Sequence, residues 1–488
     1  MRDALRQAWT AFRRPGRIIA LAAAGLVLVA SGLLFVAGNR SSCDGPCPGM
    51  AVSADGGAVS DQFWFAHRDL GPEGSITVRL TAMTGTITYP PPDHDEIVAG
   101  LVPWAKTGII VKDGTGQGSD YAALMMTGEH GVRMQYGYEH DIAGSAAEVP
   151  MEAPVWLRLT RSGDTITGFE SVDGEHWETV GKAEVEGLPE TVQVGLFATS
   201  PGDLTLREVA LGGAIEEVRF TQAVGVFDHI ALEGAADGAW RSDPVGEMNH
   251  TDWEKLHNAS GAVEDGDVMT VSGTGDIGPG GVEGWATIDK VFLGMPLALI
   301  VLVVSAARFG ALRAPSRRAL GARAGVLGAM VFAIGLVATG TVVGAGLAIL
   351  RGNGVPVEPI GALTIVRVVV GLAVVLALCA VFAFALGAVL RRRWAAVLAA
   401  LALVALPYTV TAWPLLPDAA AQWLLRLTPA AGFAVKQTLV AYPQVTAHYA
   451  PSVGYFPLPG WAGLLVLCAF TAVAVWSAVE RTERTVAV

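Results

Sequence analysis

The stretch Ile18-Ile-Ala-Leu-Ala-Ala-Ala-Gly-Leu-Val-Leu-Val-Ala-Ser-Gly-Leu-Leu-Phe-Val-Ala37 contains twenty consecutive residues without a charged side chain. A helix rises about 1.5 Å per residue, so this run matches the hydrocarbon core of a bilayer, which is roughly 30 Å thick. Because positive charges favour the cytoplasmic side, we expect a transmembrane helix over 18–37 and a cytoplasmic segment over 1–17. Five arginines precede the run, with Asp3 as the one acid among them: Arg2, Arg6, Arg13, Arg14 and Arg17.

A cleaved signal peptide is the alternative interpretation of this stretch. Arg13-Arg14 is similar to the start of a twin-arginine signal. The apolar run is longer than the roughly 7–15 residues of a signal peptide, and Pro15-Gly16 follows the arginine pair where apolar residues are expected. We therefore favour an uncleaved anchor.

Composition and charge extend this interpretation to the whole chain. Its 488 residues are 52% hydrophobic and only 16% charged, and the mean hydropathy is +0.46, which is too apolar for a soluble enzyme of this size. Residues 40–289 carry 40 Asp and Glu against 13 Lys and Arg, whereas the remainder carries 5 acids and 20 bases. This sorting predicts a large acidic extracellular domain over 38–289, with both termini cytoplasmic.

Residues 290–488 contain the other apolar runs, which brings the expected number of transmembrane helices to about six. The connectors expected inside are rich in arginine, above all 308–323 with Arg308, Arg313, Arg317, Arg318 and Arg323. Pro407 predicts a kink in the fifth span. The expected spans after the first are Val291 to Ala307, Ala324 to Leu350, most of Gly361 to Leu390, Trp394 to Trp413 and Trp461 to Val479.

The acidic segment is too long for a connection and must fold by itself. Its alternating apolar residues and Asp-Gly turns, such as Asp113-Gly and Asp173-Gly, predict short strands joined by hairpins in a β-sandwich with a core over 51–235. We expect 236–285 to be a small appended β-unit or a stalk. The expected strands include 75–82, 107–113, 131–136, 155–161 and 191–198.

Four stretches of the expected sandwich carry a family resemblance: Trp104-Ala-Lys-Thr-Gly-Ile-Ile-Val-Lys-Asp, Trp156-Leu-Arg-Leu-Thr-Arg-Ser-Gly-Asp, Ser171-Val-Asp-Gly-Glu-His-Trp and Val194-Gly-Leu-Phe-Ala-Thr. They resemble concanavalin-A-like and laminin-G-like jelly rolls. The resemblance implies a jelly-roll fold and a candidate glycan-binding role, although we favour a sandwich without a small ligand because fold does not imply function.

Cysteines and polar clusters offer few chemical sites. Cys43 and Cys47 stand just outside the first span, where we favour a local disulfide over a metal site. Cys379 and Cys468 lie in expected spans, where we expect packing roles. The cluster Asp93-His94-Asp95-Glu96 could ligate calcium or serve acid–base chemistry, but a solvated acidic loop is the favoured interpretation.

Motifs for catalysis are missing from the sequence. It has no G-x-x-x-x-G-K-[ST], no G-x-S-x-G and no H-E-x-x-H, so the chain does not bind ATP through a P-loop. We therefore expect neither an enzyme nor a cofactor or metal, and nothing indicates nucleic-acid binding.

The membrane half carries the functional signal. Residues 2–17 predict a basic amphipathic helix on the inner leaflet or, equally, a simple positive flank. Residues 418–440 are apolar but contain Arg426, Pro429 and Lys436, which suits a re-entrant or interfacial segment. For Arg367 we expect the side chain to reach the membrane surface rather than to contact a substrate.

In order and character, these elements resemble the permease subunit of type-2 ATP-binding-cassette exporters over roughly 1–40 and 290–488. The resemblance implies a second permease subunit, surrounding lipid and a separate cytoplasmic ATPase. That ATPase would dock on the N-terminal helix and on connector 308–323, which would act as a coupling helix with Arg313, Arg317 and Arg318. The connector is short and lacks acids, and the large sandwich is a second departure from the family. The stretches that carry the resemblance are Pro359-Ile-Gly-Ala-Leu-Thr-Ile-Val-Arg-Val-Val-Val-Gly, Ala385-Leu-Gly-Ala-Val-Leu-Arg-Arg-Arg and Ala421-Gln-Trp-Leu-Leu-Arg-Leu-Thr-Pro-Ala-Ala-Gly-Phe-Ala.

Two other functions stay open. A membrane-anchored receptor would bind glycan or protein through the sandwich, but five further spans exceed what an anchor needs. A membrane-embedded enzyme would need polar catalytic groups in its spans, and these are few.

Overall fold

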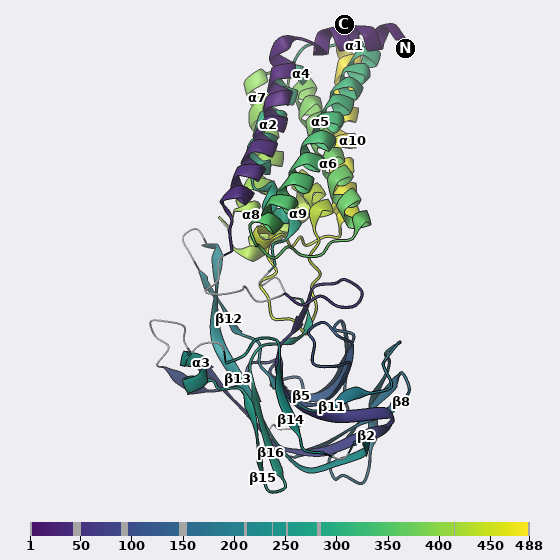
Figure 1. Cartoon of the computed structure of the whole chain (residues 1–488). Coiled ribbons are helices and arrows are strands. Elements are labelled where there is room, and N and C mark those ends of the chain that lie inside the picture. Colours follow the sequence, from purple (N-terminus) through teal and green to yellow (C-terminus); the bar gives the residue numbers. More distant parts are fainter. Residues whose placement is uncertain are drawn as a thin grey trace.

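The computed structural model describes residues 2–41, 50–88, 96–145, 154–208, 212–236, 238–249, 252–280, 285–413 and 415–486. Helices form one elongated part of the molecule and strands form the other (Figure 1). Both chain termini lie at the end of the helical part that is far from the strands, which we call the distal end (Figure 1). The chain is therefore a multi-domain protein of mixed class, as predicted.

Five helices within the described ranges are long and apolar enough to cross a membrane, which indicates a membrane-associated chain. They are α2 (Pro15–Gly38), α5 (Arg317–Gly352), α6 (Ala362–Leu390), the continuous segment Arg393–Ala412 and α10 (Gly460–Val486). The expected span over 291–307 corresponds to α4 (Met295–Gly310), which has only 16 residues. A 3-10 helix, η2 (Ile288–Phe292), precedes it, and together the two have a summed length of about 34 Å.

Helix α4 is buried between α2 and α6 and approaches both at glycines. A Cβ on Gly310 would stand 1.8 Å from the carbonyl oxygen of Phe384, and one on Gly387 would stand 2.3 Å from that of Ala307. At the other end of α4, a Cβ on Gly294 would collide with Ser31. Small residues are thus required for the close packing of α4 against its neighbours.

The segment Arg393–Ala412 is irregular just before Pro407, where the sequence predicts a kink. It consists of α7 (Arg393–Ala400), a π-helical turn η3 (Leu401–Ala405) and α8 (Leu406–Ala412). Pro407 cannot donate a backbone hydrogen bond and its ring crowds the preceding turn. A π-helical turn relieves this conflict by widening the helix.

Residues 418–440 do not form a single element. An amphipathic helix, α9 (Asp418–Leu427), is followed by the 3-10 helix η4 (Pro429–Lys436), in which every residue is buried. Helix η4 packs closely against glycines of α10 and α6. A Cβ on Gly463 of α10 would stand 2.1 Å from the Ala431 carbonyl oxygen, and one on Gly371 of α6 would stand 2.3 Å from the Val435 side chain.

In the described part of the chain, fifteen strands form one hydrogen-bonded sheet that folds over on itself through two long strands, β2 (Phe63–Thr88) and β13 (Ala214–Ala235). Strands β2 and β13 pair antiparallel over most of their length, with bulges that bend them. The main path runs β10-β9-β8-β2-β11-β4-β5-β6-β7. Its other members are β4 (Lys106–Lys112), β5 (Tyr121–Thr127), β6 (Val132–Tyr136), β7 (His140–Ala143), β8 (Val155–Ser162), β9 (Thr165–Ser171), β10 (Glu178–Glu184) and β11 (Val192–Thr199).

Two hydrophobic cores lie on opposite faces of this sheet. One is built mainly from aliphatic residues such as Ile76, Leu124 and Leu196, and the other is rich in aromatic residues such as Phe63, Tyr121 and Phe197. Strands β4 and β5 are buried on both faces. The expected strands and the sandwich-like packing are therefore confirmed. Gly114, Gly163 and Gly174 have positive φ in the expected turns.

Residues 236–285 differ from the expected appendage or stalk. Strand β14 (Arg241–Val245) pairs with β2, and β16 (Val268–Gly273) pairs with β13, so both belong to the main sheet. Val271 and Ile277 are buried in the two cores. The remaining described elements of the strand part are β1 (Val59–Asp61), β3 (Ile97–Ala99), β12 (Asp203–Glu208), β15 (Gly261–Asp265), β17 (Ile277–Pro279) and the helix α3 (Asp252–His257).

The close packing of η4 against α10 can be tested by substitution. Gly463→Ala should lower the free energy of unfolding by about 1–3 kcal/mol, because the added methyl overlaps the Ala431 carbonyl. Gly344→Ala is the matched control, since a Cβ there meets nothing within 4 Å. The measurement is thermal unfolding of both variants in the same detergent; equal stability would contradict the packing described for η4.

Candidate functional site

Exposed arginines gather at the distal end, and we call this surface the basic face. Helix α1 (Arg2–Phe12) lies across the ends of the other helices there (Figure 1). The basic face is defined by the exposed residues Arg6, Arg13, Arg14, Arg313, Arg317, Arg318, Arg392 and Arg393.

Helix α1 is attached to the end of α4 by aromatic packing. Phe12 is buried, and its ring centroid is 6.2 Å from that of Phe309 in an edge-to-face arrangement. The Arg17 guanidinium lies over the ring of Phe309, 4.2 Å from its centroid. Leu5 and Trp9 remain exposed, as in a helix that lies at a membrane surface.

The connector between α4 and α5 corrects one prediction. Residues 308–323 do not form a separate coupling helix, because α4 continues to Gly310 and α5 begins at Arg317. The Ser316 side chain accepts a hydrogen bond from the Ala319 backbone N–H at 3.2 Å and so caps the start of α5. Only residues 311–316 lie between the two helices.

The three predicted coupling arginines lie close together on this short connector and the first turn of α5. Arg313, Arg317 and Arg318 are all exposed. Arg317 also donates to Glu483 of α10 at 2.9 Å. Arg323 donates to the carbonyl oxygen of Arg313 at 3.1 Å, which holds the connector against α5.

A cavity of about 350 Å³ opens beside the connector. Its wall includes Arg391, whose φ of 57° ends α6 in the left-handed conformation and turns the chain directly into α7. Two arginines, Arg313 and Arg391, in the wall of one cavity make a surface suited to an acidic or hydrogen-bond-accepting segment of a partner. The wall is formed by 310–315, Leu320, Ala388, Arg391 and Thr482.

A buried ion pair lies at the other end of the helical part. The Lys436 ammonium at the end of η4 contacts the Asp289 carboxylate of η2 and the Tyr408 hydroxyl, the latter at 2.9 Å. Tyr408 stacks on Phe433 with ring centroids 4.0 Å apart. The pair joins η4 to the segment that leads into α4, and sequence reasoning missed it because its members are 147 positions apart.

Arg367 has a structural contact. Its guanidinium donates to the Gln437 carbonyl oxygen at 2.6 Å and thereby holds the chain where η4 ends.

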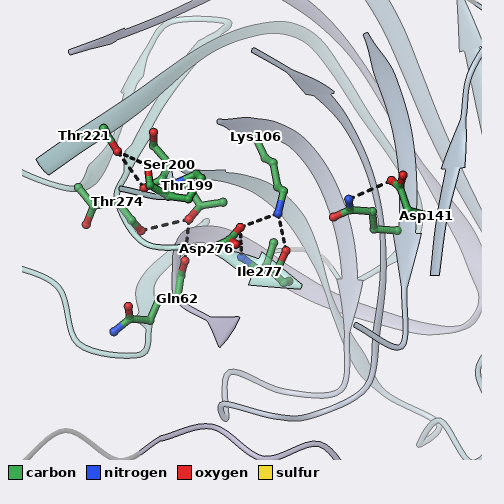
Figure 2. Close-up of polar contacts among 11 residues, drawn as sticks. Gln62, Lys106, Asp141, Thr199, Ser200, Thr221, Thr274, Asp276 and Ile277 are labelled. Carbon is green, nitrogen blue, oxygen red and sulfur yellow. Dashed lines mark hydrogen bonds and ion pairs between the residues drawn. The ribbon is translucent and has the colours of Figure 1, made fainter. Parts of the chain in front are cut away.

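The strand part contains two buried lysines that hold its small β1–β17 sheet in place. Lys112 and Asp61 are fully buried and 2.8 Å apart, and the Tyr138 hydroxyl donates to the same carboxylate oxygen at 2.8 Å. Lys106 donates to Asp276 at 2.5 Å and to the Ile277 carbonyl oxygen at 2.6 Å, as Figure 2 shows. Burial lowers the pKa of Lys112, and Asp61 opposes that shift.

The two parts meet along residues 437–459, which we call the strap. The Tyr442 hydroxyl donates to the Glu139 carboxylate at 2.9 Å, and the Gln444 amide donates to the Glu139 carbonyl oxygen at 2.9 Å. A cavity of about 470 Å³ lies between the strap at 445–447 and the strands, with Gln62, Ser200 and Asp276 in its wall (Figure 2).

The other predicted sites add nothing to these surfaces. Cys43, Cys47, Asp93, His94 and Asp95 lie outside the described residues, whereas Glu96 is described and exposed. Cys379 is buried, as expected of a packing residue. Cys468 is instead exposed, because it follows buried Leu467 on α10 and points about 100° away from it.

Comparison with known proteins does not identify a function for the basic face. No protein-family model matches the chain, and no curated protein matches it. It is similar to a functionally unknown protein from Saccharomyces cerevisiae, with 15% identity over 35% of this chain and 74% of the other and a TM-score of 0.20. It is also similar to scytalido-glutamic peptidase, with 10% identity over 44% and 99% of the two chains and a TM-score of 0.28. A GH43 protein from Bacillus licheniformis matches at 17% identity over 26% and 24%, with a TM-score of 0.18.

The buried pair in the strand part gives a second test. Asp61→Asn should destabilise the protein by about 3–5 kcal/mol, because it leaves the Lys112 ammonium buried without a counter-charge. Glu184→Gln, which breaks the exposed pair with Lys182, is the control and should change stability very little. Denaturant unfolding of both variants measures the difference, and equal midpoints would refute the stabilising role of the buried pair.

Proposed function

We propose that this chain is the permease subunit of an ATP-driven exporter and works with a separate cytoplasmic ATP-binding subunit. The observation that carries the proposal is the basic face, where α1 and the α4–α5 connector lie together at one end of a bundle of apolar helices. No P-loop occurs in the chain, so nucleotide hydrolysis falls to the partner.

Charge supports the orientation that this proposal needs. The arginine-rich connectors and α1 share the distal end, which the positive-inside tendency places in the cytoplasm. The acidic strand part lies at the opposite end and is then extracellular (Figure 1). Large apolar side chains point outward from several helices and suit contact with lipid or with a second permease subunit, among them Leu26, Val337, Leu363, Leu465 and Trp461.

Helix α5 offers a route from the basic face to the outer end. Its 36 residues begin at the connector and extend about 54 Å. Asn353, which follows the last residue of α5, donates from its side chain to the carbonyl oxygens of Val36 and Asn39 at the end of α2. A force applied to the connector by an ATPase would therefore reach the junction with the strand part through one rigid element.

A receptor function is the second candidate, and the cavity beneath the strap favours it. Its polar wall could hold a glycan or peptide without any ATPase. The two candidates differ in their partner: the exporter requires a nucleotide-binding subunit at the basic face, whereas the receptor requires a ligand at the strand part.

The exporter is tested by charge reversal on the connector. Arg313→Glu, Arg317→Glu and Arg318→Glu together should reduce co-purification of the ATPase at least about ten-fold, because they place like charges where complementary ones are needed. The measurement is affinity purification of the intact protein in mild detergent, followed by identification and quantification of its partners.

Two controls separate docking from folding. Arg392→Glu with Arg393→Glu reverses charge on the neighbouring connector and should leave more of the ATPase bound. Glu483→Arg added to the triple variant restores the pair with position 317 and should not restore docking. Absence of an ATPase from the folded wild-type protein would overturn the exporter and direct attention to ligands of the strand part.

A further inference from the structure

The side chain of His448 joins three segments at the boundary between the two parts. It is 6% exposed, with Nε2 2.6 Å from a carboxylate oxygen of Asp418 and Nδ1 3.3 Å from one of Glu216. Asp418 is the first residue of α9, Glu216 lies on β13, and His448 belongs to the strap. Both charged groups that contact the imidazole in the described part of the chain are thus carboxylates.

This arrangement requires a particular protonation state. A neutral imidazole has one nitrogen that donates and one that accepts, whereas the imidazolium ion donates from both. Ionised carboxylates only accept. The contact with Asp418 is a hydrogen bond, whereas the contact with Glu216 at 3.3 Å is an ion pair that exists only when His448 is protonated. Loss of the proton leaves a nitrogen lone pair facing the Glu216 carboxylate. Histidine is the side chain whose charge ordinarily changes between about pH 5 and 8.

The neighbouring charged groups are engaged elsewhere. Glu217, the next residue on β13, pairs with Arg207 of β12. On α9, the Arg426 guanidinium lies 5.2 Å from the ring centroid of Trp423. Tyr449 packs against Tyr455 within the strap, with centroids 5.2 Å apart. The strength of the His448–Glu216 contact therefore depends on the charge of the imidazole and of its two carboxylate partners, Glu216 and Asp418.

We propose that His448 is a pH-sensitive latch that holds the strand part to the helical part in its protonated form and releases Glu216 in its neutral form. The shorter contact identifies Asp418 as the partner that a neutral imidazole keeps through Nε2–H. Release then frees the arm formed by β12 and the start of β13, residues 203–208 and 212–220, from His448. The same arm meets the helical part where a Cβ on Gly212 would stand 2.8 Å from Pro417.

The other strap contact does not respond in this pH range. Burial, with a further contribution from Glu139, raises the pKa of Tyr442 to about 12, so its phenol keeps its proton and its hydrogen bond. The strap thus stays attached to β6 and β7 while the arm is released. The proposal does not depend on an ATPase, and its failure would leave the exporter hypothesis untouched.

The test is hydrogen–deuterium exchange of the full-length protein in lipid nanodiscs at pH 5.5 and pH 8, with intrinsic exchange rates divided out. Protection of residues 203–208 and 212–220 should fall about ten-fold at the higher pH, a size between that for loss of an exposed ion pair and that for loss of a buried one. Protection of 132–143, next to the Tyr442 contact, should not change. Equal protection of the arm at both pH values would overturn the latch.

Three variants distinguish a latch from simple packing. Glu216→Gln should keep the arm protected at pH 8, because a carboxamide N–H can donate to the unprotonated Nδ1. Glu217→Gln changes the same strand one residue away and should behave like wild type. His448→Phe should leave the arm unprotected at both pH values; if that variant does not fold, Glu216→Gln still decides, and pH dependence equal to wild type in Glu216→Gln would refute the proposal.

Discussion

The close approach of α4 to its neighbours is the constraint on which the helical part depends. This helix has 16 residues, and most of them are buried. Gly310 and Gly387 let backbone meet backbone at the distal end, and Gly294 leaves room for the Ser31 side chain of α2 near the strand part. In a bilayer the hydrophobic effect does not drive helices together, so contacts of this kind must supply the packing energy. These close approaches therefore determine where α2 and α6 pack against α4.

The same helix links the two ends of the helical part. The segment that enters it carries Asp289, which is paired with Lys436 of η4, and the segment that leaves it carries the arginines of the connector. Any displacement of the connector therefore acts on a helix that is tied to the outer elements by a buried charge pair. Removal of one member of such a pair is costly, so the tie favours movement of α4, η2 and η4 as a unit. This coupling is what an ATP-driven permease would require.

Local patterns predicted much of the architecture, because an apolar run or an alternating strand is decided by neighbours in sequence. The apolar stretch 18–37 lies within α2, and the Asp-Gly turns lie at hairpins. Long-range pairing was not predictable: β14 and β16 join the main sheet although 236–285 is rich in glycine and acids. Ser316 is a local capping signal that marks the start of α5. A coupling helix over 308–323 was expected because this signal was not taken into account. Of the candidate site, the arginines were predicted, but the cavity beside them and the contacts of His448 depend on tertiary structure.

Placement of a photoreactive amino acid at single positions of the intact protein in native membranes tests whether a nucleotide-binding protein docks on the basic face. We expect irradiation to join a nucleotide-binding protein to the chain from position 313 and from position 14 on α1. Position 175, in an exposed turn of the strand part, should not react with that protein. Cross-links to an ATPase from position 175 instead, or none from 313 and 14 in folded protein, would contradict the account of the basic face as the docking surface.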